Sequence, residues 1–231
     1  MDNNIIDLYE KARKAHKECD NDNAYKYYKE IQAIDENSWE ANFEITYFEA
    51  MSAPEKNLWA SSMAVLNIEK KIFNAIKHEI KEEEKILAID DVCRGLTHIA
   101  ERFVKIACNK FDRTEINLRD NYISEYVSSL SVAAEIMYLC GDSLSSTFKE
   151  SQLHNAASAW KKAIEINIMY IKFVSNKIDQ MDTIKKYTNK IKKTDDTYKA
   201  PSIEVTSHTN RSTGYKIKKF FSRISPKSRN K

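Results

Sequence analysis

The sequence predicts an all-helical protein, and its composition and apolar spacing are the reasons. The chain has 231 residues, of which 42% are hydrophobic, so it is long enough to bury a substantial core. It contains only three glycines and three prolines, whereas strand hairpins and phosphate-binding loops need many tight turns. Apolar residues recur at intervals of three and four along most of the chain, which is the period of amphipathic helices. We expect about seven helices, a size that suits one domain.

Three short helices are expected in the first 53 residues. Apolar residues recur from Ile5 to Ala15 in the first helix. The polar cluster 20–23 supplies turn and capping residues, and the second helix begins near Ala24. Asn37, with a glutamate three residues later, has the spacing of a capping box at the start of a third helix.

Longer helices are expected after residue 53. Ser52 and Glu55 have the spacing of a second capping box, with Pro54 in the first turn, and the apolar period then continues to Ile80. The next apolar run extends over residues 86–106 and is followed by a break at 112–114. These patterns predict a fourth and a fifth helix.

The last predicted helices lie between residues 122 and 193. A sixth helix covers 122–140, and Gly141 is expected to end it, because glycine readily takes the left-handed conformation of a C-cap. The seventh covers 153–178, and a thinner apolar stripe extends it to Ile191. Residues 194–214 are rich in serine and threonine with little to bury, which predicts a flexible linker. The expected organisation is a helical body at 1–193, divided into 1–53 and 54–193, then the linker and a basic tail at 215–231.

The segment from Leu8 to Phe48 has the spacing of a 34-residue helical repeat. Ala12 and Thr46 are 34 residues apart, and the second helix has apolar residues at Ala24, Tyr28 and Ile31. This pattern resembles the tetratricopeptide repeat, in which two antiparallel helices cross at small residues. It covers about one and a half repeats and is not continued after residue 54. The resemblance implies a module of the kind that binds other proteins.

The resemblance also implies a partner groove lined by the first helix of each pair. The expected groove residues are Tyr9, Arg13, His16, Lys17, Phe43, Tyr47 and Met51. The first four are mostly basic and the last three are apolar, which suits a peptide with an acidic end and a hydrophobic anchor. The alternative is that the long helix after residue 54 packs into this groove and makes the apolar residues part of the core.

No catalytic, cofactor-binding or metal-binding motif is found in the chain. The glycine-rich loops of nucleotide-binding proteins and the GxSxG turn of hydrolases are absent, and the four cysteines form no CxxC pair. His78, His98 and His154 have no glutamate three residues before them, whereas a di-iron bundle needs the Glu-x-x-His pattern. We expect a non-enzymatic protein without a cofactor, and a metal-dependent helical enzyme is the least favoured alternative.

Charge is divided unequally between the body and the tail. Eight basic residues and no acidic residue follow Glu204, so this end carries +8 while residues 1–204 carry −5. Ile217, Phe220, Phe221 and Ile224 have the spacing of one helix face, which predicts a basic amphipathic helix. The tail residues expected to contact a membrane or phosphates are Lys216, Lys218, Lys219, Phe220, Phe221, Arg223, Ile224, Lys227 and Arg229.

Three interpretations of the tail are open. It can lie on an anionic membrane with its phenylalanines in the interface, remain solvated or docked on the acidic body, or bind nucleic acid phosphates. The chain has neither a signal-peptide pattern nor a membrane-spanning apolar run, which favours a cytoplasmic protein, peripheral at the inner membrane face if the first interpretation holds. We therefore expect a protein-interaction or scaffold module tethered by its tail, and the alternative is a nucleic-acid accessory protein.

Overall fold

The structure is a computed structural model that describes residues 3–202, and these residues form eight α-helices with four short 3₁₀ segments and no strand. The α-helices are α1 (Asn3–Lys17), α2 (Asn21–Ile34), α3 (Trp39–Ser52), α4 (Leu58–Glu79), α5 (Glu82–Arg113), α6 (Arg119–Phe148), α7 (Leu153–Tyr170) and α8 (Lys177–Ile191). The 3₁₀ segments are η1 (Glu55–Asn57), η2 (Ile116–Leu118), η3 (Lys149–Gln152) and η4 (Ile171–Phe173). The predicted all-α fold class is confirmed for this part of the chain.

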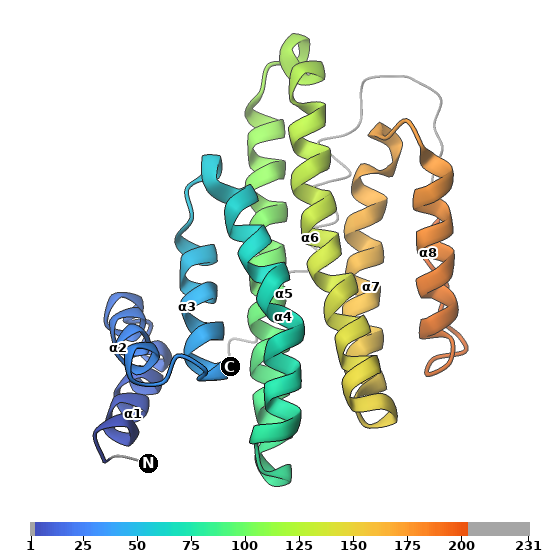
Figure 1. Cartoon of the computed structure of the whole chain (residues 1–231). Coiled ribbons are helices and arrows are strands. Elements are labelled where there is room, and N and C mark those ends of the chain that lie inside the picture. The colour runs from blue at the N-terminus through green and yellow to red at the C-terminus, as the bar shows by residue number, and fades with distance from the viewer. Residues whose placement is uncertain (1–2, 203–231) are drawn as a thin grey trace, which may run out of the picture.

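The helices lie in an elongated row, with the α1/α2 pair at one end and α8 at the other (Figure 1). Helix α6 occupies the middle of the row, where it packs against α4, α5 and α7. Helix α3 links the N-terminal pair to the longer helices through its contacts with α2, α4 and α5. The bundle of longer helices that was expected after residue 53 therefore continues directly from the short N-terminal ones.

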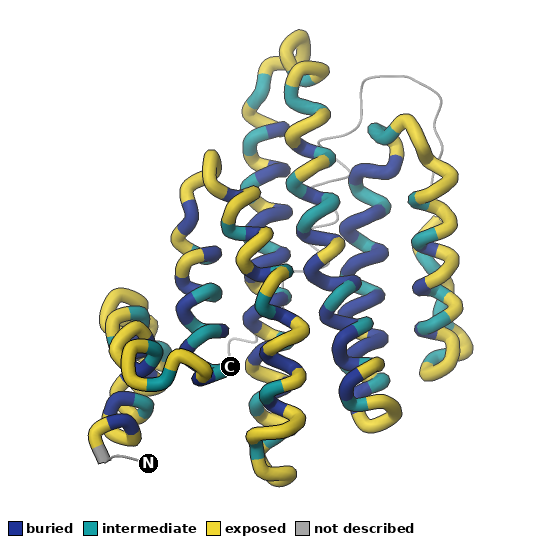
Figure 2. Tube along the Cα trace, viewed as in Figure 1, coloured by how far each residue is buried: buried dark blue, intermediate teal, exposed yellow. Residues whose placement is uncertain are grey.

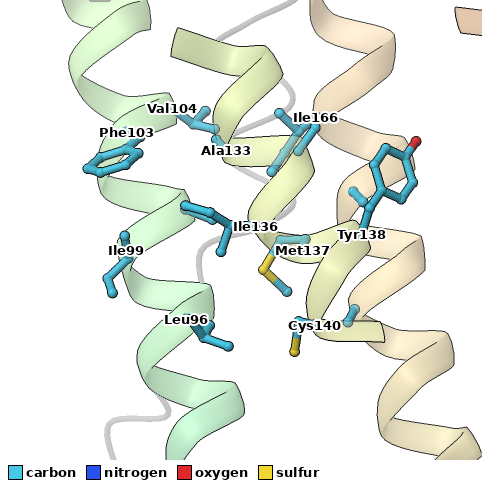
Figure 3. Close-up of a cluster of buried hydrophobic side chains, with 14 of the residues drawn as sticks. Leu96, Ile99, Phe103, Val104, Ala133, Ile136, Met137, Tyr138, Cys140 and Ile166 are labelled. Atoms are coloured by element: carbon cyan, nitrogen blue, oxygen red, sulfur yellow. The ribbon is translucent and has the colours of Figure 1, made fainter. Parts of the chain in front are cut away.

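The main hydrophobic core lies between α5, α6 and α7 (Figure 3). Helix α5 contributes Leu96, Ile99 and Phe103, which are spaced three and four residues apart and so lie on one helix face. Ile136 of α6 lies opposite this face, Ile166 of α7 belongs to the same core, and all five side chains are buried. The amphipathic period of α5 is therefore explained by burial from Ile89 to Phe111, whereas Ile86, at the start of the predicted apolar run, is 60% exposed.

A second, smaller core joins α1, α2 and α3. Ala12 and Ala24 are fully buried, and their small side chains allow α1 and α2 to approach closely. Tyr28 and Ile31 of α2 are buried beside them, together with Phe48 of α3. Ala12 and the apolar residues of the second helix are thus part of this N-terminal core, whereas Thr46, 34 residues after Ala12, is only partly buried.

Neither predicted capping box forms at the ends of α3. Ser38, not Asn37, caps the helix, because its hydroxyl accepts a hydrogen bond from the Ala41 N–H at 3.1 Å. Ser52 is the last residue of α3, and its hydroxyl donates to the Phe48 carbonyl at 2.8 Å. The predicted positions of both helix boundaries are correct to within a few residues, but the predicted capping side chains are wrong.

Gly141 does not end α6, because the helix continues for another two turns to Phe148. No glycine in the described residues has a positive φ. The Trp160 indole instead lies against Gly141, where a Cβ atom would come within 2.3 Å of the indole Nε1. Glycine is needed here for close packing between α6 and α7 rather than for a C-cap.

The seventh predicted helix is two helices in the structure. Helix α7 ends at Tyr170, and Asn176 caps the separate helix α8, where Ile178 is exposed instead of continuing the apolar stripe. The start of the predicted linker also contacts the body, since Lys161 of α7 bonds to Asp195 at 2.8 Å. The rest of the linker, 203–214, and the predicted tail, 215–231, lie outside the described residues.

Candidate functional site

Three of the four predicted groove residues on α1 bond to side chains at the start of α3. The pairs are Tyr9–Ser38, with 2.6 Å between hydroxyl oxygens, Arg13–Glu40, with 2.8 Å from Nε to the carboxylate, and His16–Glu44, with 3.1 Å from Nδ1 to the carboxylate. The hydrogen bond to Glu40 raises the pKa of Arg13, and the neighbouring Glu44 carboxylate raises the pKa of His16. The positive charge predicted for this part of the groove is therefore matched by carboxylates of the chain itself.

Lys17 and His16 lie at the C-terminal end of α1 in different surroundings. The His16 ring packs on Tyr47 and Phe48 of α3, with centroids 5.6 and 5.0 Å apart. Lys17 is exposed and makes no ion pair with another described residue. Of the four predicted residues on α1, only Lys17 thus offers an unmatched charge within the described part of the chain.

The apolar half of the predicted groove is covered by α5. Phe43 is only 4% exposed, and its ring lies so close to Gly95 of α5 that a Cβ there would come within 2.6 Å of the ring Cζ. Tyr47 and Met51 are half-buried and pack against the main core. Phe43 is core, as the alternative interpretation expects, but the helix that lies against it is α5 and not the helix directly after residue 54, and Phe43 is not accessible to a peptide.

A surface cleft of about 500 Å³ opens where η1, the end of α5 and the start of α6 meet. Lys110 crosses this region and bonds to Glu55 and Glu125, each at 2.6 Å, with its ammonium 5.1 Å from the Tyr122 ring centroid. The cleft is lined by Glu55, Ile106, Asn109, Lys110, Arg113, Thr114, Glu115, Leu118 and Tyr122. The lining has two acidic and two basic residues, so it has no strong charge preference.

Glu69 of α4 is a buried carboxyl group without a cation. It is 2% exposed, and neither carboxylate oxygen has a hydrogen-bond partner. Burial raises the pKa of Glu69 well above its usual value, and the neighbouring Cys93 and Glu135 act in the same direction. Glu69 lies on the inner face of α4, where burial favours its neutral form.

Asp142 of α6 joins α7 and α8 to the bundle. Its carboxylate accepts hydrogen bonds from Trp160 Nε1 at 2.9 Å, Tyr187 Oη at 3.0 Å and Lys190 Nζ at 2.7 Å. The Tyr187 ring also stacks on Tyr138, with centroids 4.1 Å apart. These contacts fix α8 in place.

Among residues 3–202, no three histidine, cysteine, aspartate or glutamate side chains converge as a metal site.

The outer face of α4 carries an exposed ridge that differs from the surfaces described above. We define the α4 ridge as Trp59, Met63, Asn67, Lys70, Asn74 and Lys77, which are spaced three or four residues apart and are all exposed. Figure 2 shows that exposed segments, in yellow, recur along α4. Trp59 is 62% exposed and Met63 is 38% exposed. Tryptophan is usually among the more deeply buried residues, so this pair is an unusual surface feature.

The α4 ridge was missed in the sequence because α4 also has a strong inner stripe. Val65, Ile72 and Ile76 form that stripe and are buried, so the helix period is explained without Trp59 and Met63. The available signal was that these two apolar residues lie off the stripe.

Within the described residues, no helix has both the length and the apolar content to cross a bilayer.

Comparisons of the chain with protein-family models, with curated proteins and with solved structures find no match. The side chains described above are therefore the basis for a function.

Proposed function

We propose that the protein is a non-enzymatic protein-interaction module that binds its partner through the α4 ridge. The observation that carries this proposal is the exposure of Trp59 and Met63 one helical turn apart on α4. Tryptophan and methionine are enriched in protein interfaces, and tryptophan is among the residues that most often dominate the binding energy. An interface that buries Trp59 gains about 2 kcal/mol or more from such a residue, which corresponds to about a thirtyfold change in affinity.

The N-terminal helices support this surface in our proposal rather than forming the groove themselves. Arg13 and His16 are paired with α3 carboxylates, and Phe43 is buried against α5. Helix α3 packs along α4, so the unit that resembles a tetratricopeptide pair holds α4 from one side. The α4 ridge remains free for a partner.

Two matched double variants test the proposal. Trp59→Ser with Met63→Ser removes the apolar pair of the ridge, and Ile178→Ser with Met181→Ser removes a somewhat more exposed pair from α8. In pull-downs from native cells read by mass spectrometry, we expect the α4 variant to lose a partner that both the wild type and the α8 variant retain. Equal retention by all three proteins would contradict the proposal.

The basic tail, in the same proposal, holds the module at an anionic membrane surface on the cytoplasmic side. The support is its charge of +8 beyond Glu204 together with the adjacent Phe220 and Phe221. Removal of residues 205–231 is expected to abolish sedimentation with anionic vesicles and to leave the melting temperature unchanged. Equal sedimentation of the truncated protein would contradict the tether, and retention on DNA or RNA that falls steeply with salt would favour the nucleic-acid alternative.

A further inference from the structure

The α4 surface has no exposed acidic residue between Leu58 and His78, and Glu79, the last residue of the helix, is exposed. Residues 58–78 contain Lys70, Lys71, Lys77 and His78, and the one acid among them is Glu69, which points into the core. The three lysines form no ion pair with another described residue. Because residues 1–204 carry a net charge of −5, this helix face is a local exception to the charge of the body.

The apolar and basic residues of the α4 ridge are separated along the helix axis rather than around it. Trp59 and Met63 occupy the N-terminal half of the ridge, and Lys70 and Lys77 occupy the C-terminal half. At a rise of about 1.5 Å per residue, Met63 and Lys70 are about 10 Å apart along the axis, and the whole ridge spans about 27 Å. The ridge therefore presents an apolar end and a cationic end to one elongated ligand.

We propose, on the basis of the function proposed above, that the partner contributes an acidic segment with an apolar anchor at one end. The anchor packs on Trp59 and Met63, and carboxylates that follow it lie opposite Lys70, Lys71 and Lys77. Charge complementarity of this kind orients the segment and speeds its association, while the apolar contact supplies most of the affinity.

Other occupants fit the ridge less well. The chain's own tail is basic, so the three lysines repel it, and a second copy would bring the same unpaired lysines together. A helix that lies on a bilayer has its apolar side along its full length, whereas the apolar side of α4 is inside the core. Binding to nucleic acid phosphates would use Lys70 and Lys77 but has no need of Met63.

Two labelled synthetic peptides test the proposal against the full-length protein. The first is helical, with two leucines one turn apart at one end and glutamates toward the other, and the second has lysine in place of each glutamate. We expect the acidic peptide to bind at least tenfold more tightly than the basic one in fluorescence anisotropy. Equal binding of the two peptides would overturn the proposal.

Charge-reversal variants locate the binding. Lys70→Glu with Lys71→Glu and Lys77→Glu is expected to weaken binding of the acidic peptide at least tenfold, and Trp59→Ser is expected to do the same. Lys192→Glu with Lys193→Glu, just after α8, is the matched control and is expected to change binding less than twofold. An unchanged affinity in the α4 variants would overturn the proposal.

The same variants separate this inference from the function on which it rests. If the α4 charge variant still captures the cellular partner that Trp59→Ser with Met63→Ser loses, the ridge is an interface but its partner is not acidic. If Trp59→Ser abolishes vesicle binding or dissociates a dimer of the full-length protein in sedimentation, a bilayer or a second copy replaces the acidic segment.

Discussion

Replacement of Phe43 with alanine tests whether the predicted groove face of α3 is core. Phe43 is 4% exposed and lies against Gly95 within the main core. Truncation of a buried phenylalanine to alanine costs about 3–5 kcal/mol. For a protein of this size each kcal/mol lowers the melting temperature by about 2–4 °C, so we expect Phe43→Ala to lower it by about 6–20 °C.

Thermal unfolding followed by far-ultraviolet circular dichroism measures this effect, with Trp59→Ala as the matched control. Both variants lose a large aromatic side chain, but Trp59 is 62% exposed, and exposed substitutions usually change stability by less than about 0.5 kcal/mol. We expect the control to melt within about 2 °C of the wild type. The reasoning would be refuted if Phe43→Ala melted as the wild type does, because a groove residue with free space around it would behave in that way.

Three further changes probe the interior. Gly141→Ala is expected to lower the melting temperature, because overpacking against Trp160 costs about 1–3 kcal/mol. The better helix propensity of alanine offsets only about 1 kcal/mol of this cost. A higher melting temperature would contradict the close contact between Gly141 and Trp160. Burial raises the pKa of Glu69 in the folded state above its ordinary value in the unfolded state. Its contribution to the free energy of unfolding is therefore fully present below the ordinary pKa and is lost as the pH rises through the folded-state pKa. Glu69→Gln should therefore reduce the fall in unfolding free energy as the pH rises above the ordinary carboxyl range in urea titrations, and an unchanged fall would show that burial does not raise the pKa of Glu69. Asp142→Ala leaves the hydrogen-bond donors of Trp160 and Lys190 without their acceptor, so it should lower the free energy of unfolding by about 2 kcal/mol. Amide hydrogen exchange in α8 should become faster. Unchanged exchange in α8 would show that Asp142 does not hold this helix.

The helical fold class could be predicted from the sequence because helix periodicity is local. Ala12, Ala24 and Tyr28 were identified from their spacing alone and are buried in the N-terminal core. Gly141 was assigned wrongly because glycine is used both for left-handed caps and for close packing. Only the position of Trp160, 19 residues further along the chain, distinguishes the two uses.

Whether the predicted groove is open to a partner depends on contacts between residues far apart in the sequence. Phe43 and Gly95 come from different helices, and no local pattern indicates that α5 covers α3. Glu40 was expected at the start of α3 as part of a capping box, but its carboxylate instead binds Arg13. Spacing predicts which face of a helix is apolar, but tertiary packing decides whether that face is open to a partner.

Site-specific photo-crosslinking tests the central claim that a partner binds the α4 ridge. A photoreactive amino acid at Asn67 lies between the apolar and basic halves of the ridge, and the same group at Asn189, on the exposed side of α8, is the control. We expect a partner adduct from position 67 whose crosslinked peptide is acidic and which disappears in the Trp59→Ser background. Adducts of equal yield from positions 67 and 189, or an adduct at 67 that persists without Trp59, would contradict the claim.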